Sequence, residues 1–143
     1  MTKETKMTNA KDILQTTFTA LEARDKANAM TLFTDDAVLF DPHYPSPEMK
    51  GRAAIEKGLD WGLKSMEKFG FTIEKVYMGE DGTSCAVEVD THHVLKGGKE
   101  LRFPQAFFVE TKGGKITALR AYEPYGPNGF MGFMLRLSHK FAR

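Results

Sequence analysis

The second half of the chain alternates apolar and polar residues in four segments that tight turns separate. The segments span residues 71–79, 84–95, 100–111 and 115–122. Glycine-containing turns lie between them at 80–82, 96–99 and 113–114. Alternation with a period of two is typical of strands with one buried face, and glycine pairs between such runs are typical of hairpins. This half of the chain therefore predicts a four-stranded antiparallel meander.

The first half of the chain has helical periodicity instead. Apolar residues recur three and four positions apart from about residue 9, where Asn9 is the expected N-cap and Asp12 the supporting acid. A short second helix follows the break at Arg24 and Asp25. A third helix is expected over 52–68 and is expected to end at Gly70.

A short strand and a stiff loop are predicted between the second and third helices. Asp35 and Asp36 predict a turn, and the strand covers 37–41 because Pro42 has no backbone N–H for a ladder. The proline-rich stretch 42–51 is expected to be a loop.

Grouped helices followed by a meander predict an α+β fold with the helices on one face of the sheet. The more apolar face of the strands should turn towards those helices. That face carries Val87, Val89, Thr91, His93 and Leu95, and on the next strand Phe103, Gln105, Phe107 and Val109. His93 and Gln105 are then the polar side chains inside.

Composition argues against several classes of protein, including nucleic-acid-binding, disulfide-linked and membrane-spanning proteins. The chain of 143 residues suits one domain, and its formal net charge of +1 argues against a nucleic-acid partner. Cys85 is the only cysteine, which excludes an intrachain disulfide and a thiolate metal cluster. Residues 1–9 lack an apolar leader, and no apolar run reaches the roughly 20 residues that span a membrane. A soluble, cytoplasmic protein is expected, with no membrane partner.

Three sequence strings together resemble the nuclear transport factor 2-like superfamily, in its SnoaL-like (polyketide cyclase) and ketosteroid isomerase-like branches. These strings are DDAVLFDP, MKGRAAI and GKITALRAY. The resemblance implies a cystatin-like α+β roll: a cone-shaped, strongly curved, mostly antiparallel sheet wrapped around three N-terminal helices and enclosing a pocket. It also implies a small apolar or polycyclic ligand, no cofactor and a homodimer. The expected division is a flexible N-terminus at 1–8, the domain at 9–125 and a C-terminal arm or helix at 126–143.

The same resemblance makes Asp41 the candidate general base, because it lies at the position where ketosteroid isomerases keep theirs. An aspartate rimmed by apolar side chains can have a raised pKa and move a proton. The competing interpretation is that Asp41 only initiates the turn before Pro42. The isomerase's oxyanion-hole tyrosine corresponds to Thr17, and its protonated aspartate to Ala106, or to Gln105 if the register slips by one. Thr17 and Gln105 are weaker hydrogen-bond donors than a phenol or a carboxylic acid, which predicts a chemistry other than steroid isomerisation.

Further side chains are candidates for the substrate pocket: Tyr44 at its mouth, Trp61 closing it or covering a subunit interface, His93 and Phe107 on the inner face, and Glu123 near its floor. His43 follows Asp41 closely enough to share a proton with its carboxylate or to orient a carbonyl, but an exposed loop position is the preferred interpretation. Adjacent strand residues point to opposite faces, so His92 and His93 do not share a metal, and no metal site is expected.

Two hypotheses follow. The first is a cofactor-free acid/base enzyme of isomerase, cyclase, dehydratase or hydrolase type, with Asp41 as base and Gln105, Thr17 and His93 as polarising donors. The second is a ligand-binding or dimerisation module of the same fold. The basic, Met-rich C-terminal arm is expected to pack over the pocket mouth or onto a second subunit.

Overall fold

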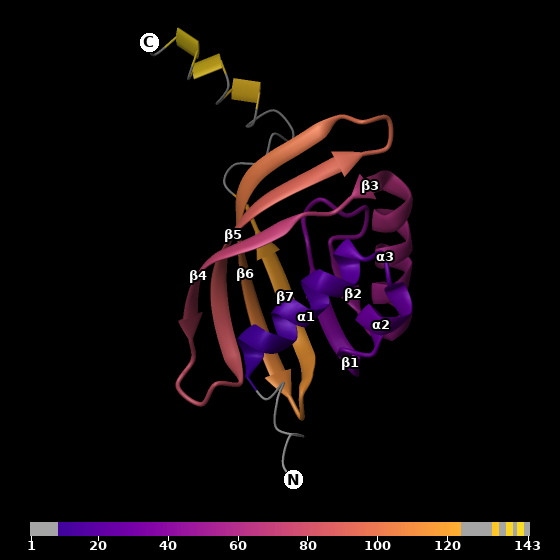
Figure 1. Ribbon diagram of the computed structural model, residues 1–143, viewed down its shortest axis with the longest axis vertical. Helices are drawn as coiled ribbons and strands as arrows, with labels where there is room; N and C mark the ends of the chain where they lie inside the picture. Colours follow the sequence, from indigo (N-terminus) through magenta and orange to yellow (C-terminus); the bar gives the residue numbers. More distant parts are fainter. Residues whose placement is uncertain (1–8, 124–132, 135–136, 139, 142–143) are drawn as a thin grey trace.

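The protein folds as a curled sheet around a small helical layer (Figure 1). The structure is a computed structural model that describes residues 9–123, 133–134, 137–138 and 140–141. The helices are α1 (Ala10–Glu22), α2 (Lys26–Met30) and α3 (Arg52–Ser65). The strands are β1 (Phe33–Phe40), β2 (Glu48–Lys50), β3 (Met66–Lys68), β4 (Phe71–Met78), β5 (Ser84–Leu95), β6 (Glu100–Lys112) and β7 (Lys115–Tyr122).

The seven strands form one sheet in the order β2-β1-β7-β6-β5-β3, and β4 also pairs with β5. The predicted meander β4-β5-β6-β7 is confirmed, with antiparallel pairing throughout. β1 then joins β7 in parallel, so the sheet is mixed. Long β5 and β6 curl across the molecule and make the predicted α+β cone, a half-barrel that holds the helices on its concave side (Figure 1).

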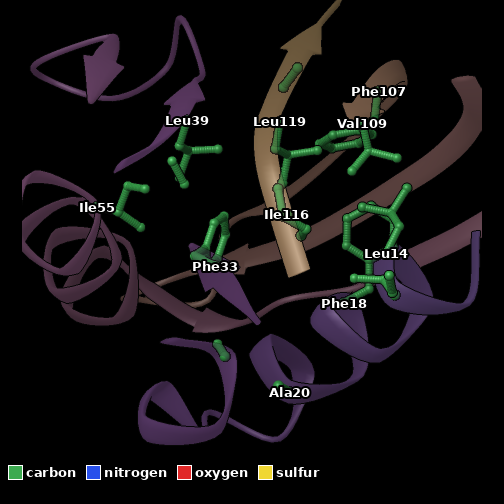
Figure 2. Packing of buried hydrophobic residues seen from close by; sticks show 14 of the residues in the cluster. Leu14, Phe18, Ala20, Phe33, Leu39, Ile55, Phe107, Val109, Ile116 and Leu119 are labelled. Atoms are coloured by element: carbon green, nitrogen blue, oxygen red, sulfur yellow. The ribbon is translucent and has the colours of Figure 1, made fainter. Parts of the chain in front are cut away.

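Helix α1 begins where the sequence predicted, because Asn9 Oδ1 accepts the backbone N–H of Asp12 at 2.9 Å. Its buried side packs on the sheet through Phe18, whose ring stacks on Phe71 with centroids 4.3 Å apart and meets Phe107 edge-on at 5.0 Å. Figure 2 shows the rest of this core, where α1 and α3 meet residues of β1, β6 and β7. The predicted inner face is confirmed: Thr91, His93 and Gln105 are buried beside the apolar residues of their strands.

Three local predictions are wrong. Asp35 and Asp36 lie inside β1, where the pairing with β7 shifts register between Phe33 and Val38, so a bulge takes the place of the turn. The loop 42–51 contains β2, which folds back on β1. The third helix ends at Ser65, and Met66–Lys68 is a strand on the end of β5 that β4 leaves uncovered.

Arg24 joins the helical layer to this irregular end of α3. Its guanidinium donates to the carbonyl oxygens of Leu63 at 2.5 Å, Met66 at 2.9 Å and Glu67 at 3.2 Å. The Leu63 carbonyl is one of the last C=O groups of α3, which a helix leaves without partners, and the other two follow it in β3. Arg24 reaches them from a left-handed backbone conformation, with φ of 60°.

No helix in the described part of the chain is long and apolar enough to cross a membrane. Most of the arm at 126–143, for which packing was predicted, lies outside the described residues; Phe133, Met134 and Phe141 within it are exposed. The domain limits at 9–125 stay a prediction.

We expect Arg24→Ala to lower the free energy of unfolding by about 1–3 kcal/mol, since it removes three charge-assisted hydrogen bonds at one helix end. Arg24→Gly should lower it by less, because glycine adopts a positive φ without strain. Urea unfolding measures both values. Equal stability of Arg24→Ala and the wild type would contradict this role for the guanidinium.

Candidate functional site

A cavity of about 60 Å³ lies between the helices and the concave face of the sheet. Aromatic and aliphatic side chains make up most of its wall, including Phe18, Phe33, Phe69, Phe71, Phe103, Phe107 and Leu119. The polar residues that reach it are Thr17, Asp41, His43, Tyr44, His93 and Gln105. A mostly apolar enclosure with a few convergent polar groups is typical of a small-molecule site.

Asp41 lies directly after β1, and its backbone is held on both sides. Its N–H donates to Pro47 O at 3.0 Å, and its carbonyl accepts from the N–H of Tyr44 at 3.1 Å. Its Oδ1 accepts the backbone N–H of His43 at 3.0 Å. The turn interpretation is therefore correct, but it does not exclude a chemical role. Burial raises the pKa of Asp41 to about 6, against the weaker opposing effect of the His43 hydrogen bond.

His43 does not occupy the exposed loop position that was preferred for it. Its Nε2 lies 2.6 Å from Oε2 of Glu123, and its Nδ1 lies 3.7 Å from Oδ1 of Asp41. The ring also meets Phe103 edge-on, with centroids 5.3 Å apart. The hydrogen bond to Glu123 raises the pKa of His43. The side chain of Glu123, which directly follows β7, is 5% exposed. Glu123 does not line the cavity, where the sequence predicted it, and it reaches the site through His43.

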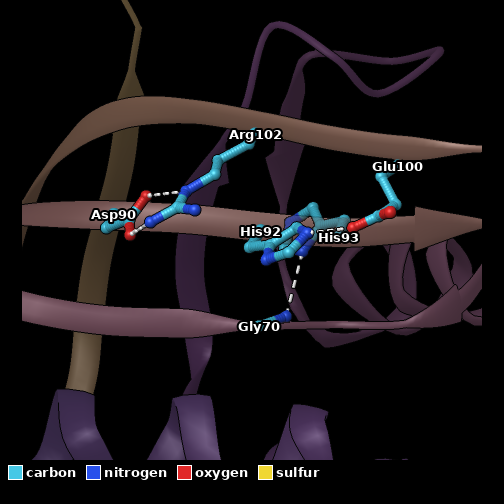
Figure 3. Close-up of polar contacts among 6 residues, drawn as sticks. All are labelled: Gly70, Asp90, His92, His93, Glu100 and Arg102. Atoms are coloured by element: carbon cyan, nitrogen blue, oxygen red, sulfur yellow. Dashed lines mark hydrogen bonds and ion pairs between the residues drawn. The ribbon is translucent and has the colours of Figure 1, made fainter.

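His93 is fixed as a neutral donor. Its Nδ1 accepts the backbone N–H of Gly70 at 3.1 Å, while the neighbouring His92 turns outward to Glu100 at 2.6 Å (Figure 3). Burial lowers the pKa of His93 to about 4, so the ring is uncharged at neutral pH and its proton belongs on Nε2. No larger residue fits in place of Gly70, because a Cβ there would lie 2.4 Å from the carbonyl oxygen of His92.

Gln105 is the second inward donor. Its Oε1 accepts the hydroxyl proton of Thr91 at 2.6 Å, a buried bond that orients the amide. Within the described residues, neither Nε2 of Gln105 nor Nε2 of His93 has a hydrogen-bond partner. Both N–H groups line the cavity and are available to a ligand oxygen.

The remaining predicted residues divide into two groups. Thr17 and Phe107 line the cavity, but the Thr17 hydroxyl donates to Ile13 O at 2.9 Å and so has no proton left for a ligand. Tyr44 lines it too, packed over Gly62 of α3, and burial raises its pKa. Trp61 does not line it; its ring leans against Tyr44 at 5.1 Å and borders a neighbouring surface groove.

One group has the spacing of a metal site. Single ligand atoms of Asp41, His43 and Glu123 all lie within 4.8 Å of one another. Two carboxylates and an imidazole suit a divalent transition metal. The 2.6 Å contact between His43 Nε2 and Glu123 Oε2 already pairs these two side chains with each other. Sequence analysis did not group these three residues, because Glu123 lies far along the chain from the other two. The adjacent Asp41, Pro42 and His43 were the only local signal of the cluster.

A family model described as a SnoaL-like domain matches residues 14–119. A search of curated protein sequences finds no match. Solved structures with the same fold include a ketosteroid isomerase-like protein from Catenulispora acidiphila in complex with trimethylamine, with 25% identity, a TM-score of 0.67 and coverage of 77% of this chain and 83% of that one.

Two more show the fold. A putative polyketide cyclase from Pseudomonas putida has 18% identity and a TM-score of 0.70 over 81% of this chain and 92% of that one. A Δ5-3-ketosteroid isomerase from Mycobacterium sp. has 20% identity and a TM-score of 0.69 over 78% and 90%. The family match covers most of the chain and agrees with the curled sheet, the three helices and the enclosed cavity: this protein belongs to the SnoaL-like family.

Proposed function

We propose that this protein is a cofactor-free enzyme that moves a proton on a small, largely apolar carbonyl compound, with Asp41 as the base. The observation that carries the proposal is a buried carboxylate with a raised pKa on the wall of the same apolar cavity as two unpaired N–H donors. A base whose pKa lies near the working pH is both ionised and basic enough to act.

The reaction begins with a C–H bond next to the carbonyl carbon. Asp41 takes the proton, and the electron pair of that bond moves onto the carbonyl oxygen. Nε2–H of His93 and Nε2–H of Gln105 donate to the oxygen as its charge develops, which is where preorganised donors lower a barrier most. Return of the proton from Asp41 to another carbon isomerises the compound. Attack of the enolate on a second carbonyl cyclises it, and the new alkoxide oxygen takes the proton back from Asp41.

The substrate is compact. The cavity of about 60 Å³ is far smaller than the roughly 300 Å³ at the lower end of sites for drug-sized ligands. The trimethylamine held by the Catenulispora acidiphila protein is a ligand of suitable size. A steroid, the substrate class in the name of the Mycobacterium enzyme, would require the side chains around the cavity to move apart.

A second candidate is ligand binding without chemistry. It is favoured by Thr17, whose hydroxyl is bonded to its own helix, and by Ala106, which replaces the aspartate expected in a steroid isomerase. Such a module would bind a ketone through His93 and Gln105 but leave its C–H bonds intact.

The two candidates predict different rates for the isomerisation of 3-cyclohexen-1-one to its conjugated isomer. Ultraviolet absorbance follows this reaction, with EDTA present. We expect Asp41→Asn to reduce the rate by at least about a hundredfold and Gln105→Met by about tenfold to a hundredfold. His92→Gln, on the outer face, is the matched control. A wild-type rate no higher than that of Asp41→Asn, with the ketone still bound by NMR, would favour the binding module.

A buried base also has a measurable stability cost. Asp41 ionises with a pKa of 3.8 when unfolded and about 6 when folded, so the fold favours the protonated form. Its contribution to stability is complete below pH 3.8 and is lost as pH rises through about 6. Each tenfold change in the ionisation constant is worth about 1.4 kcal/mol, so this loss is at most about 3 kcal/mol.

We therefore expect Asp41→Asn to raise the free energy of unfolding at pH 7.5 by up to about 3 kcal/mol and to leave it nearly unchanged at pH 3.5. Urea titrations at the two pH values measure the difference. If Asp41→Asn destabilised the protein equally at both pH values, the carboxylate would act only as the hydrogen-bond acceptor of its turn.

We also infer that the protein forms homodimers through the outer face of the sheet and acts in the cytoplasm. Tyr77, Phe108 and Tyr122 are 53%, 42% and 44% exposed, and the register aligns Tyr77 and Phe108 across β5. Phe108 and Tyr122 are in edge-on contact at 5.7 Å. Apolar patches of this kind mark protein contacts.

We expect light scattering to give twice the chain mass for the wild type and the single chain mass for Phe108→Lys, because a buried lysine charge disfavours an apolar interface. Ala53→Lys, which adds the same charge at an exposed position of α3, is the control for charge alone. A wild-type mass of one chain would contradict the dimer.

A further inference from the structure

His43 lies between two carboxylates of different accessibility. The side chains of Asp41, His43 and Glu123 are 17%, 27% and 5% exposed. His43 is thus the most exposed member of the cluster, and it contacts both others: Glu123 through Nε2 at 2.6 Å and Asp41 across 3.7 Å from Nδ1. The ring therefore offers a proton on Asp41 a route to water beside the carboxylate's own smaller exposed surface.

Glu123 orients His43 and balances its charge. Oε2 of Glu123 accepts the Nε2 proton, which leaves Nδ1 of the neutral ring as the free acceptor beside Asp41. Oε1 of Glu123 is buried and has no hydrogen-bond partner within the described residues. The carboxylate therefore depends on His43 for compensation, and it stabilises the imidazolium when Nδ1 gains a proton.

We propose that His43 is a second proton-transfer residue of this site, which takes from Asp41 the proton removed from the substrate and passes it to water, with Glu123 as the positioning residue. This rests on the proposed function of Asp41. The transfer requires the 3.7 Å between Nδ1 of His43 and Oδ1 of Asp41 to shorten to hydrogen-bond distance. The Oδ–H bond of Asp41 then breaks as an Nδ1–H bond forms, and Glu123 balances the imidazolium. Loss of the Nδ1 proton to water restores the neutral ring, so no other reactant is consumed.

The relay competes with direct return of the proton to the substrate. A proton that stays on Asp41 is transferred to the new carbon, and one that leaves through His43 is replaced by a solvent proton. In D2O the first route gives unlabelled product and the second gives product with deuterium. The ratio of labelled to unlabelled product therefore measures the relay independently of the overall rate.

The ratio should depend on pH, because Nδ1 accepts only when it is unprotonated. The titratable groups that face His43 are Asp41 and Glu123, with His93 across the cavity, and Phe103 contributes only its ring edge. Glu123 raises the pKa of His43, so labelling should increase with pH through that raised value. Glu123→Gln keeps a hydrogen-bond acceptor but removes the charge, and should move this increase to lower pH.

The test is the conversion of 3-cyclohexen-1-one in D2O, with deuterium in the product counted by mass spectrometry. We expect His43→Gln to lower the labelled-to-unlabelled ratio at least about fivefold at pH 8, because glutamine cannot take up a proton. His92→Gln is the matched control: His92 has the same 2.6 Å bond to a glutamate, on the outer face, and should leave the ratio as in the wild type.

An unchanged ratio in His43→Gln, with isomerisation that still depends on Asp41, would overturn the relay and leave the proposed function standing. Absence of Asp41-dependent isomerisation in the wild type would overturn both. If His43→Gln does not fold, nitrogen-15 NMR of the wild type can determine which ring nitrogen of His43 carries the proton. We expect this proton on Nε2 at high pH, and a neutral ring with its proton on Nδ1 would overturn the relay.

Discussion

The parallel pairing of β1 with β7 is the constraint on which the candidate site depends. Phe40 pairs with Arg120 in this ladder, so both strands run towards the same end of the sheet. Asp41 follows the first strand and Glu123 the second, and the loop between Pro42 and Gly51 returns as β2 along β1. An antiparallel pair would have sent these two carboxylates to opposite ends. Among the described strands this is the one parallel pairing, and it assembles the cluster around His43.

Curvature of the sheet supplies the other requirement, a dry environment. β5 and β6 curl far enough for Phe107 to meet Phe18 of α1, and Phe103 lines the same cavity beside His43 and His93. Desolvation then acts in opposite directions on the two kinds of group: it raises the pKa of Asp41 and lowers that of His93. One apolar enclosure therefore provides a basic carboxylate and a neutral imidazole at the same pH.

Sequence patterns predicted those parts of the fold that depend on local periodicity. The neighbours of His93 and Gln105 along their own strands were sufficient to predict that both side chains face inward. The cap at Asn9 was likewise predictable from Asp12, three residues away. β2 and β3 were missed because each is three residues long and exists only where another strand leaves an edge open. His43 looked exposed because its partner is 80 positions away along the chain, and only the β1–β7 register brings them together.

The identity of the donors limits which reactions such a site supports. A protonated carboxyl or a phenol can hand over its proton to a developing enolate, whereas a neutral imidazole N–H and an amide N–H can only share theirs. Burial and the Gly70 N–H hold His93 in that neutral form, and the hydrogen bond from Thr91 orients the amide of Gln105. In the proposed reaction, stabilisation of the enolate would therefore be modest, and the C–H bond would have to be acidified within the substrate itself. A second carbonyl or a neighbouring double bond does this, so β-dicarbonyl and β,γ-unsaturated compounds match the site better than simple ketones.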